Sequence, residues 1–179
     1  MLSRREIKEA YQKCLKEYSV RKQDSEKKFV NNYLEKAMHN LELAGVLDLL
    51  SRDEEAKKAI GISSKSNYYD WIIITSYYSM YLAATTALAK IGIKSTTHGA
   101  TIIALEYHYC IEKNLLARKY IQMIEEASFG REDVEKLDQA MKGRISVQYT
   151  VSKSYGDNEA KRMLKDAKEF VNKISEIIT

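Results

Sequence analysis

The 179-residue sequence contains no proline and only seven glycines. Because these two residues most often interrupt regular structure, their scarcity favours long helices joined by short connections. Hydrophobic residues make up 45% of the chain and charged residues 30%, a balance typical of globular rather than disordered proteins. The length corresponds to one domain, with enough residues to bury its own core.

The sequence also lacks the motifs of several enzyme and metal-binding classes. It contains neither a GxGxxG nor a GxxxxGK[ST] phosphate loop. Cys14 and Cys110 are far apart and form no CxxC pair, and the three histidines lack the HExxH spacing of a metal site. We therefore expect no metal and no cofactor. The net charge of +4 permits nucleic-acid binding, but no run of basic residues indicates it.

Targeting and membrane signals are equally sparse. The opening "MLSRREIKEAYQK" has no apolar core of a signal peptide, so we expect a cytoplasmic protein. Trp71–Ala89 carries no charge and is long enough to cross a bilayer. It contains five serines and threonines and few strongly inserting residues, so we favour a helix buried on all sides within a bundle, and no membrane contact.

Hydrophobic residues recur at intervals of three and four along the chain, the pattern of amphipathic helices. The predicted helices are Leu2–Tyr18, a second from Asp24 or Ser25, a short one capped by Ser51 and ending at Gly61, Asn67–Ile91, one from Thr96 or Thr97, two separated by "SFG", and a last one carrying Ala160 to Ile177. We expect an all-α, up-and-down bundle of four to five core helices, with an N-terminal helix and short extra helices.

Arg144 lies on the inward stripe of one of these predicted helices. Val134, Leu137 and Met141 precede it, and Gln148 follows it, at spacings of three or four residues. Burying an unpaired arginine is costly, so its guanidinium must meet a carboxylate, carbonyl groups or water. A salt bridge, a stem packed inward with its charged head at the surface, and an anion-binding groove would each satisfy this requirement.

Two other residues are candidates for the same groove. Tyr149 follows Arg144 by five residues, about 140° around a helix, so the two could border one groove or meet across a two-fold axis. His98, in "TTHGA", begins a predicted helix beside unpaired backbone N–H groups. Such a position can hold a phosphate, or it can be an exposed capping turn.

Four stretches together resemble the HEPN superfamily. They are "LEKAMHNLELAGVL" (Leu34–Leu47), "SYYSMYLAATTALAKIGIKSTTHGATI" (Ser76–Ile102), "RISVQY" (Arg144–Tyr149) and "AKRMLKDAKEFVNKI" (Ala160–Ile174). The second is the most specific, because paired tyrosines, a helix of small residues, a glycine and a histidine-glycine turn follow in that order. The resemblance implies a HEPN-like helical bundle over residues 26–179, preceded by an N-terminal helical extension over residues 1–25.

The resemblance also implies a homodimer. Many members carry Arg-x4–6-His, and two copies of this motif meet at the dimer cleft and cleave RNA without a metal. Arg144 matches the family arginine, and Tyr149 fills the histidine position, as in a branch with Arg-x4-Tyr. Because tyrosine titrates near ~10 and histidine near ~6.5, Tyr149 is a poor general base at neutral pH.

The expected function is therefore binding of RNA or a nucleotide at a dimer cleft formed by Arg144, Tyr149 and His98, with no catalytic residue assigned. Some members are toxins encoded beside a small nucleotidyltransferase, which implies such a protein as an antitoxin partner. Two alternatives stay open. One is an active, metal-independent endoribonuclease toxin in which Tyr149 or His98 replaces the missing histidine. The other is a non-catalytic adaptor whose cleft binds only protein.

Overall fold

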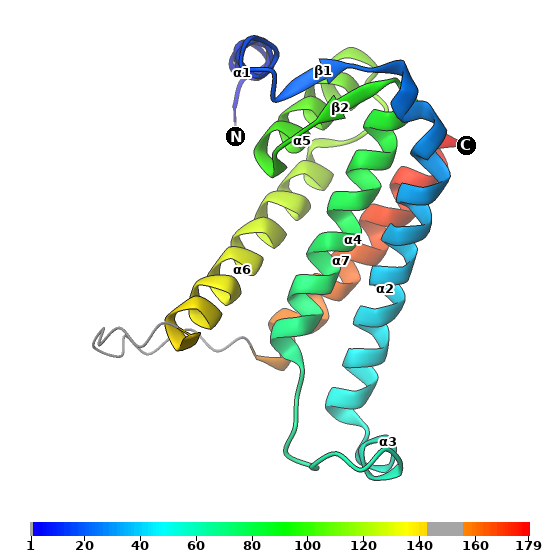
Figure 1. Ribbon diagram of the computed structural model, residues 1–179, viewed down its shortest axis with the longest axis vertical. Helices are drawn as coiled ribbons and strands as arrows, with labels where there is room; N and C mark the ends of the chain where they lie inside the picture. Colours follow the sequence, from blue (N-terminus) through cyan, green and yellow to red (C-terminus); the bar gives the residue numbers. More distant parts are fainter. Residues whose placement is uncertain (1, 143–155) are drawn as a thin grey trace.

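The computed structural model describes residues 2–142 and 156–179 and confirms the predicted all-α bundle (Figure 1). In chain order the elements are α1 (Arg4–Lys16), β1 (Val20–Lys22), the 3₁₀-helix η1 (Asp24–Phe29), α2 (Val30–Arg52), α3 (Glu54–Ala59), α4 (Tyr69–Lys90), β2 (Ile93–Ser95), α5 (His98–Leu105), the π-helix η2 (Glu106–Glu112), α6 (Arg118–Lys142) and α7 (Asp157–Ile178).

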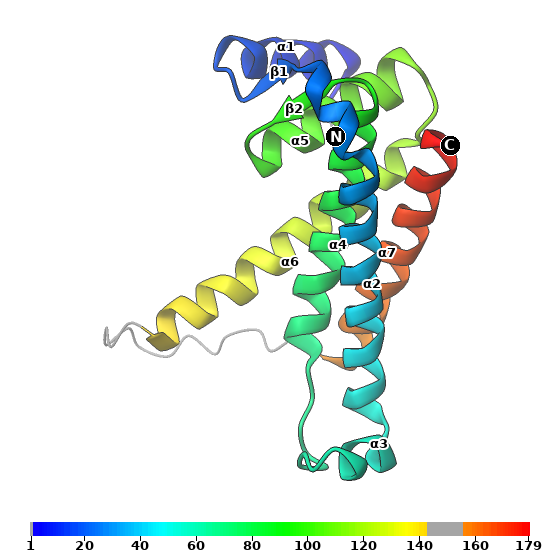
Figure 2. The same cartoon turned by 45° about the vertical axis from the view of Figure 1, so that its right-hand side comes forward.

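Helices α2, α4 and α7 lie side by side along the long axis of the molecule, and α6 leans away from α4 toward its far end (Figures 1 and 2). Helix α4 is central, because it packs against α2, α7, α6 and α5. The core includes fully buried side chains from several of these helices: Ala37, Ile73, Tyr77, Met80, Leu105, Ile124, Phe170 and Ile174. The uncharged stretch of α4, residues 71–89, is therefore explained by the central position of this helix.

Helix α4 is long and apolar enough to cross a membrane, but 72% of its most apolar window is buried inside the bundle. Its threonines are satisfied within the helix, whereas the buried hydroxyls of Ser76 and Ser79 have no hydrogen-bond partner among the described residues. The hydroxyls of Thr75, Thr85 and Thr86 donate to main-chain carbonyls four residues earlier, at 2.7, 2.9 and 2.8 Å. Such bonds let threonine enter a core without a partner from another helix. The structure thus agrees with the prediction of a buried core helix.

The predicted break at "SFG" (128–130) is wrong, because α6 runs without interruption from Arg118 to Lys142. A glycine inside a helix costs only about 1 kcal/mol. Burial of a large aliphatic side chain such as Ile121 or Ile124, which are 3% and 0% exposed, contributes about 1.5–3 kcal/mol. The packing of this helix against the core therefore outweighs the tendency of Gly130 to interrupt a helix.

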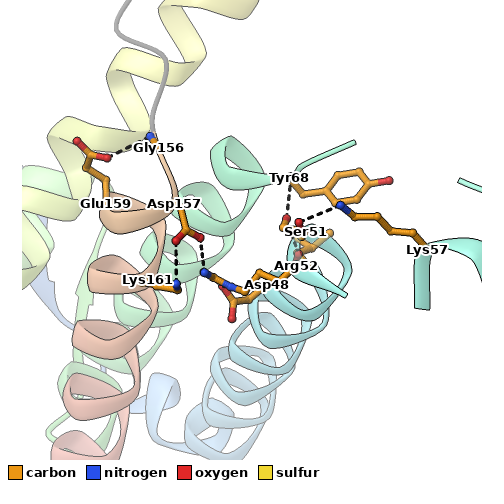
Figure 3. A network of polar contacts seen from close by, with 10 residues as sticks. Asp48, Ser51, Arg52, Lys57, Tyr68, Gly156, Asp157, Glu159 and Lys161 are labelled. Carbon is orange, nitrogen blue, oxygen red and sulfur yellow. Dashed lines mark hydrogen bonds and ion pairs between the residues drawn. The ribbon is translucent and has the colours of Figure 1, made fainter. Parts of the chain in front are cut away.

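The predicted cap of the short helix α3 is also wrong. Ser51 lies inside α2, where its hydroxyl donates to the Leu47 carbonyl at 2.8 Å and accepts from the Tyr68 N–H at 2.9 Å (Figure 3). Asp53 caps α3 instead, because its carboxylate accepts from the Ala56 N–H at 3.0 Å. Both residues suit a cap position, so the sequence pattern alone did not distinguish them.

A small layer of N-terminal residues covers one end of the bundle (Figures 1 and 2). Strands β1 and β2 pair antiparallel, with Val20 opposite Ser95, Arg21 opposite Lys94 and Lys22 opposite Ile93. Strands of three residues are too short for an alternating pattern to reveal them in the sequence. Helix α1 packs against α5 and η2 through a buried stripe formed by Ile7, Tyr11 and Cys14.

His108 links α1 to the π-helix η2. Its Nδ1 lies 2.6 Å from Glu112 Oε2, and its Nε2 lies 2.8 Å from the Tyr11 hydroxyl. The Tyr11 ring also stacks on Tyr107, with the ring centroids 4.1 Å apart. The π-helix therefore presents two consecutive rings to α1, and they hold the N-terminal helix against the bundle.

This contact predicts a pH-dependent stability. Burial lowers the pKa of His108 from 6.5, against an opposing effect of Glu112. The folded protein favours the neutral imidazole. The contribution of His108 to the free energy of unfolding is therefore complete above about pH 6.5 and is lost as the pH falls through the lower pKa of the folded state. The melting temperature of the wild-type protein should fall between about pH 7.5 and pH 5.5, and we expect this fall to be smaller in the His108→Gln variant. His39→Gln, at an exposed position on α2, is the control, and an unchanged fall in His108→Gln would contradict the assignment.

Candidate functional site

The structure describes one of the three predicted site residues. Arg144 and Tyr149 lie outside the described residues, so their predicted roles stay predictions. His98 is the first residue of α5 and is partly buried. Thr97 precedes it as the N-cap, and its hydroxyl accepts from the Ala100 N–H at 3.2 Å. Thr97, one of the two residues predicted to begin this helix, is therefore its cap.

The His98 imidazole contacts tyrosines of α4. Its Nδ1 is hydrogen-bonded to the hydroxyl of Tyr77. Its ring stacks on Tyr81, with centroids 4.3 Å apart and an angle of 24° between the planes. Tyr78 meets it edge-on at 6.4 Å. Three tyrosines of α4, at positions i, i+1 and i+4, thus place aromatic rings around the start of α5.

Helix α6 adds a cation to this cluster. The guanidinium carbon of Arg131 lies 5.0 Å from the centre of the Tyr77 ring, within the range of a cation–π interaction. The Arg131 side chain is only 13% exposed, and its Nη2 lies 3.4 Å from Glu132 Oε1. We call the five residues Tyr77, Tyr78, Tyr81, His98 and Arg131 the aromatic site.

The protonation of Tyr77 determines how its hydroxyl and His98 interact. Burial raises the pKa of Tyr77 to about 12, against smaller opposing effects of Ser128 and Arg131. The phenol therefore stays protonated at neutral pH, and the imidazole tautomer sets whether it donates to His98 Nδ1 or accepts from it. The His98 imidazole and the Arg131 guanidinium both lie against the Tyr77 ring, and both groups can donate hydrogen bonds to an anion.

The rings of the aromatic site differ in exposure. Tyr77 is fully buried, whereas Tyr78, Tyr81 and His98 are partly exposed. Partly exposed rings can stack on a nucleobase, and a nearby arginine can hold a phosphate. The chemistry of the aromatic site therefore fits a nucleotide better than a purely apolar ligand.

A second polar network joins the start of α7 to the end of α2 (Figure 3). The Arg52 guanidinium, at the end of α2, is hydrogen-bonded to both Asp48 and Asp157. Asp157 also accepts from Lys161 at 2.7 Å, and these two cations lower its pKa, with Lys161 as the larger cause. The start of α7 is thus held to the end of α2 by charge-assisted hydrogen bonds.

The described residues offer no cluster of three or more His, Cys, Asp or Glu side chains that could hold a metal ion. Cys14 and Cys110 are both buried free thiols. Burial raises the pKa of Cys110 to about 12, so its thiol is not an activated nucleophile at neutral pH.

Comparison with known families gives a match to the HEPN domain over residues 46–177, well over half of the chain. The chain belongs to the HEPN family. No curated protein matches it significantly. The HEPN match includes every residue of the aromatic site, as well as Arg144 and Tyr149, and it begins within α2. Helix α1, strand β1 and η1 all precede it. The assignment to a branch with Arg-x4-Tyr and the division of the chain at residues 25 and 26 both stay predictions.

Proposed function

We propose that this HEPN protein is a homodimer that binds RNA or a nucleotide in a cleft lined by Arg144 and Tyr149 and extended by His98. A small nucleotidyltransferase is the proposed partner, in a toxin–antitoxin pair. HEPN membership supports an RNA-related or nuclease-like function. The observation that carries the proposal to this chain is the aromatic site, in which His98 stacks on the partly exposed ring of Tyr81 and Arg131 lies over the buried ring of Tyr77.

Exposed apolar side chains on α4 and α6 support self-association. Trp71 is 59% exposed and Phe129 is 70% exposed, although both lie on helices of the core bundle. Helix α6 leans away from α4 toward its far end (Figure 2). Aromatic residues are enriched at protein interfaces, so a second copy packed in this region would bury side chains that are otherwise costly to expose.

Replacing Arg144 with alanine tests the proposed cleft. Hydrogen bonds to charged groups contribute about 1.5–3 kcal/mol, so we expect RNA affinity to fall by roughly 10- to 150-fold. The measurement is fluorescence anisotropy of a labelled single-stranded RNA in EDTA. Arg162→Ala is the control, because this arginine lies on the exposed surface of α7. Equal affinities of the Arg144→Ala variant and the wild-type protein would contradict the proposal.

The endoribonuclease alternative has one observation in its favour. Tyr77 fixes Nδ1 of His98, which is how a structural partner orients a catalytic histidine. This alternative expects RNA cleavage in EDTA that is lost in both Arg144→Ala and His98→Gln. Intact RNA at high protein concentration, in the presence of measurable RNA binding, would exclude the alternative and leave the binding proposal. Protein co-purification without RNA binding would instead favour the adaptor.

A further inference from the structure

The N-terminal layer, formed by α1, β1 and η1, carries the excess positive charge of the chain. Residues 1–28 contain nine Lys and Arg but five Asp and Glu, a net charge of +4 that equals the net charge of the whole chain. The other residues contain twenty of each kind and are neutral overall. The layer lies outside the HEPN match, so its charge is not explained by the HEPN bundle itself.

The β1–β2 ribbon places one of these cations, Arg21, opposite a cation of β2. Arg21 and Lys94 are directly opposite each other in the antiparallel register, where like charges destabilise a strand pair. Glu26, which is 2% exposed, offsets Lys94 through an ion pair of 3.1 Å. Arg21 and Lys22 are exposed, and no carboxylate of the described part of the chain lies within 4.0 Å of their charged nitrogens. An anion bound there would relieve the repulsion.

Two exposed aromatic rings neighbour these cations in the sequence. Tyr18, just before the ribbon, is 77% exposed. Phe29, just after the basic segment of η1, is 40% exposed, and the Lys28 ammonium lies 4.9 Å from the centre of its ring. Cations interleaved with exposed rings are the pattern by which proteins bind single-stranded nucleic acid, through phosphates and stacked bases.

Tyr18 occupies a backbone position that favours glycine. Its φ is 55°, and α1 ends there with the Tyr18 N–H donating to Leu15 and the Ser19 N–H donating to Cys14, a Schellman arrangement. The left-handed conformation is sterically unfavourable for a tyrosine. Because the ring is exposed, its packing contributes little stability to offset this. Stability therefore does not account for the tyrosine, and a ligand that stacks on the ring would.

The ribbon connects this surface to the aromatic site. The Thr96 N–H donates to the Ser19 carbonyl at 2.9 Å, so Tyr18 lies at the end of the ribbon from which the chain continues to His98. Lys22 lies at the opposite end, where Gln23 donates to the Gly92 carbonyl. Strand β2 leads into α5 (Figure 1), which begins at His98, so a strand of nucleic acid that follows the ribbon in this direction would approach His98.

We propose that the N-terminal layer is a second binding surface for single-stranded RNA, in which Arg21, Lys22 and Lys28 contact phosphates and Tyr18 stacks on a base. The proposal rests on the proposed function, because it extends the same RNA beyond the HEPN cleft. An anionic membrane is a poorer ligand. The apolar face of α1, formed by Ile7, Tyr11 and Cys14, is already buried against the bundle and cannot insert into lipid.

Charge removal on this surface provides the test. A labelled single-stranded RNA is titrated in EDTA at several salt concentrations with four proteins: wild type, the triple variant Arg21→Gln/Lys22→Gln/Lys28→Gln, the charge-matched control Lys36→Gln/Lys65→Gln/Lys168→Gln, and Arg144→Ala. Each phosphate contact with single strands contributes about 0.7 to the slope of log affinity against log salt, so the triple variant should reduce the slope by about 2 and weaken binding at least tenfold. The control, whose lysines are exposed elsewhere, should change affinity less than twofold.

The outcomes separate the two proposals. If the triple variant alone weakens binding, the N-terminal surface is supported and the Arg144 cleft fails. If Arg144→Ala alone weakens it, the cleft is supported and the surface fails. Equal losses of RNA affinity in the triple variant and its control would mean that RNA is attracted by net charge only. This result would overturn the proposed N-terminal surface. Binding of polyglutamate or anionic vesicles through the same residues, without RNA binding, also overturns it.

Tyr18→Gly gives an independent measurement. Glycine relieves the backbone strain, so the melting temperature should rise by roughly 2–4 °C, the shift that accompanies ~1 kcal/mol in a domain of this size. Loss of a stacked base should at the same time weaken RNA binding about 5- to 100-fold, and Tyr18→Phe should retain it. A more stable protein with undiminished RNA affinity would overturn the role assigned to Tyr18.

Discussion

Phe170→Ala is expected to reduce the free energy of unfolding by about 3–5 kcal/mol, the largest effect expected of any substitution considered for this protein. Phe170 lies in the middle of α7 and is 0% exposed. Its ring meets that of Tyr120 from α6 in an edge-to-face contact, with centroids 6.3 Å apart. Alanine would remove this contact and leave a cavity between helices that cannot easily move together.

Phe129 offers the matched control, because the same substitution there removes the same atoms from a side chain that is 70% exposed. We expect Phe129→Ala to change the free energy of unfolding of the monomer by less than about 0.5 kcal/mol in urea denaturation. Its effect should instead be on self-association, measured by analytical ultracentrifugation. Similar destabilisation by the two variants would mean that the core does not depend on α7 as described.

The helices were predictable where the pattern that specifies them is local. Thr97 and Gly92 lie at the predicted start of α5 and just after the end of α4, and a cap hydroxyl or a glycine with φ of 70° acts on its immediate neighbours. The amphipathic stripe of α7 was equally clear. The unbroken α6 was not predictable in this way, because Gly130 is tolerated only through contacts with distant helices. The π-helix η2 left no pattern that hydrophobic periodicity could detect.

The aromatic site was predicted only in part, for a related reason. His98 was selected by its position at a helix start, but its contact with Tyr77 depends on how α5 packs against α4. Arg131 follows the apparent break at "SFG" and resembles an ordinary surface charge in the sequence; only the continuous α6 brings it onto the Tyr77 ring. The spacing of Tyr77 and Tyr81 by four residues was the one available signal, and a core stripe gives the same spacing.

His98→Leu is expected to destabilise the fold and weaken RNA binding together. Leucine has a similar volume but cannot form a hydrogen bond with the buried hydroxyl of Tyr77, and an unsatisfied buried hydroxyl costs about 1–3 kcal/mol. The neighbouring Ser128 hydroxyl, which hydrogen-bonds to Tyr77, should keep the cost toward the lower end of this range. Loss of a ring that stacks on Tyr81 should also reduce RNA affinity by roughly 5- to 150-fold, if a base stacks there.

The double variant Tyr77→Phe/His98→Leu separates the two effects. It removes both partners of the hydrogen bond, and replacing both by apolar groups is nearly neutral for stability, so most of the lost unfolding free energy should return. RNA affinity should not return, because neither phenylalanine nor leucine supplies the imidazole. Urea denaturation and RNA anisotropy on the wild type, both single variants and the double variant complete the cycle. If RNA affinity recovers along with stability, His98 serves the fold alone, and the aromatic site is part of the core rather than of the cleft.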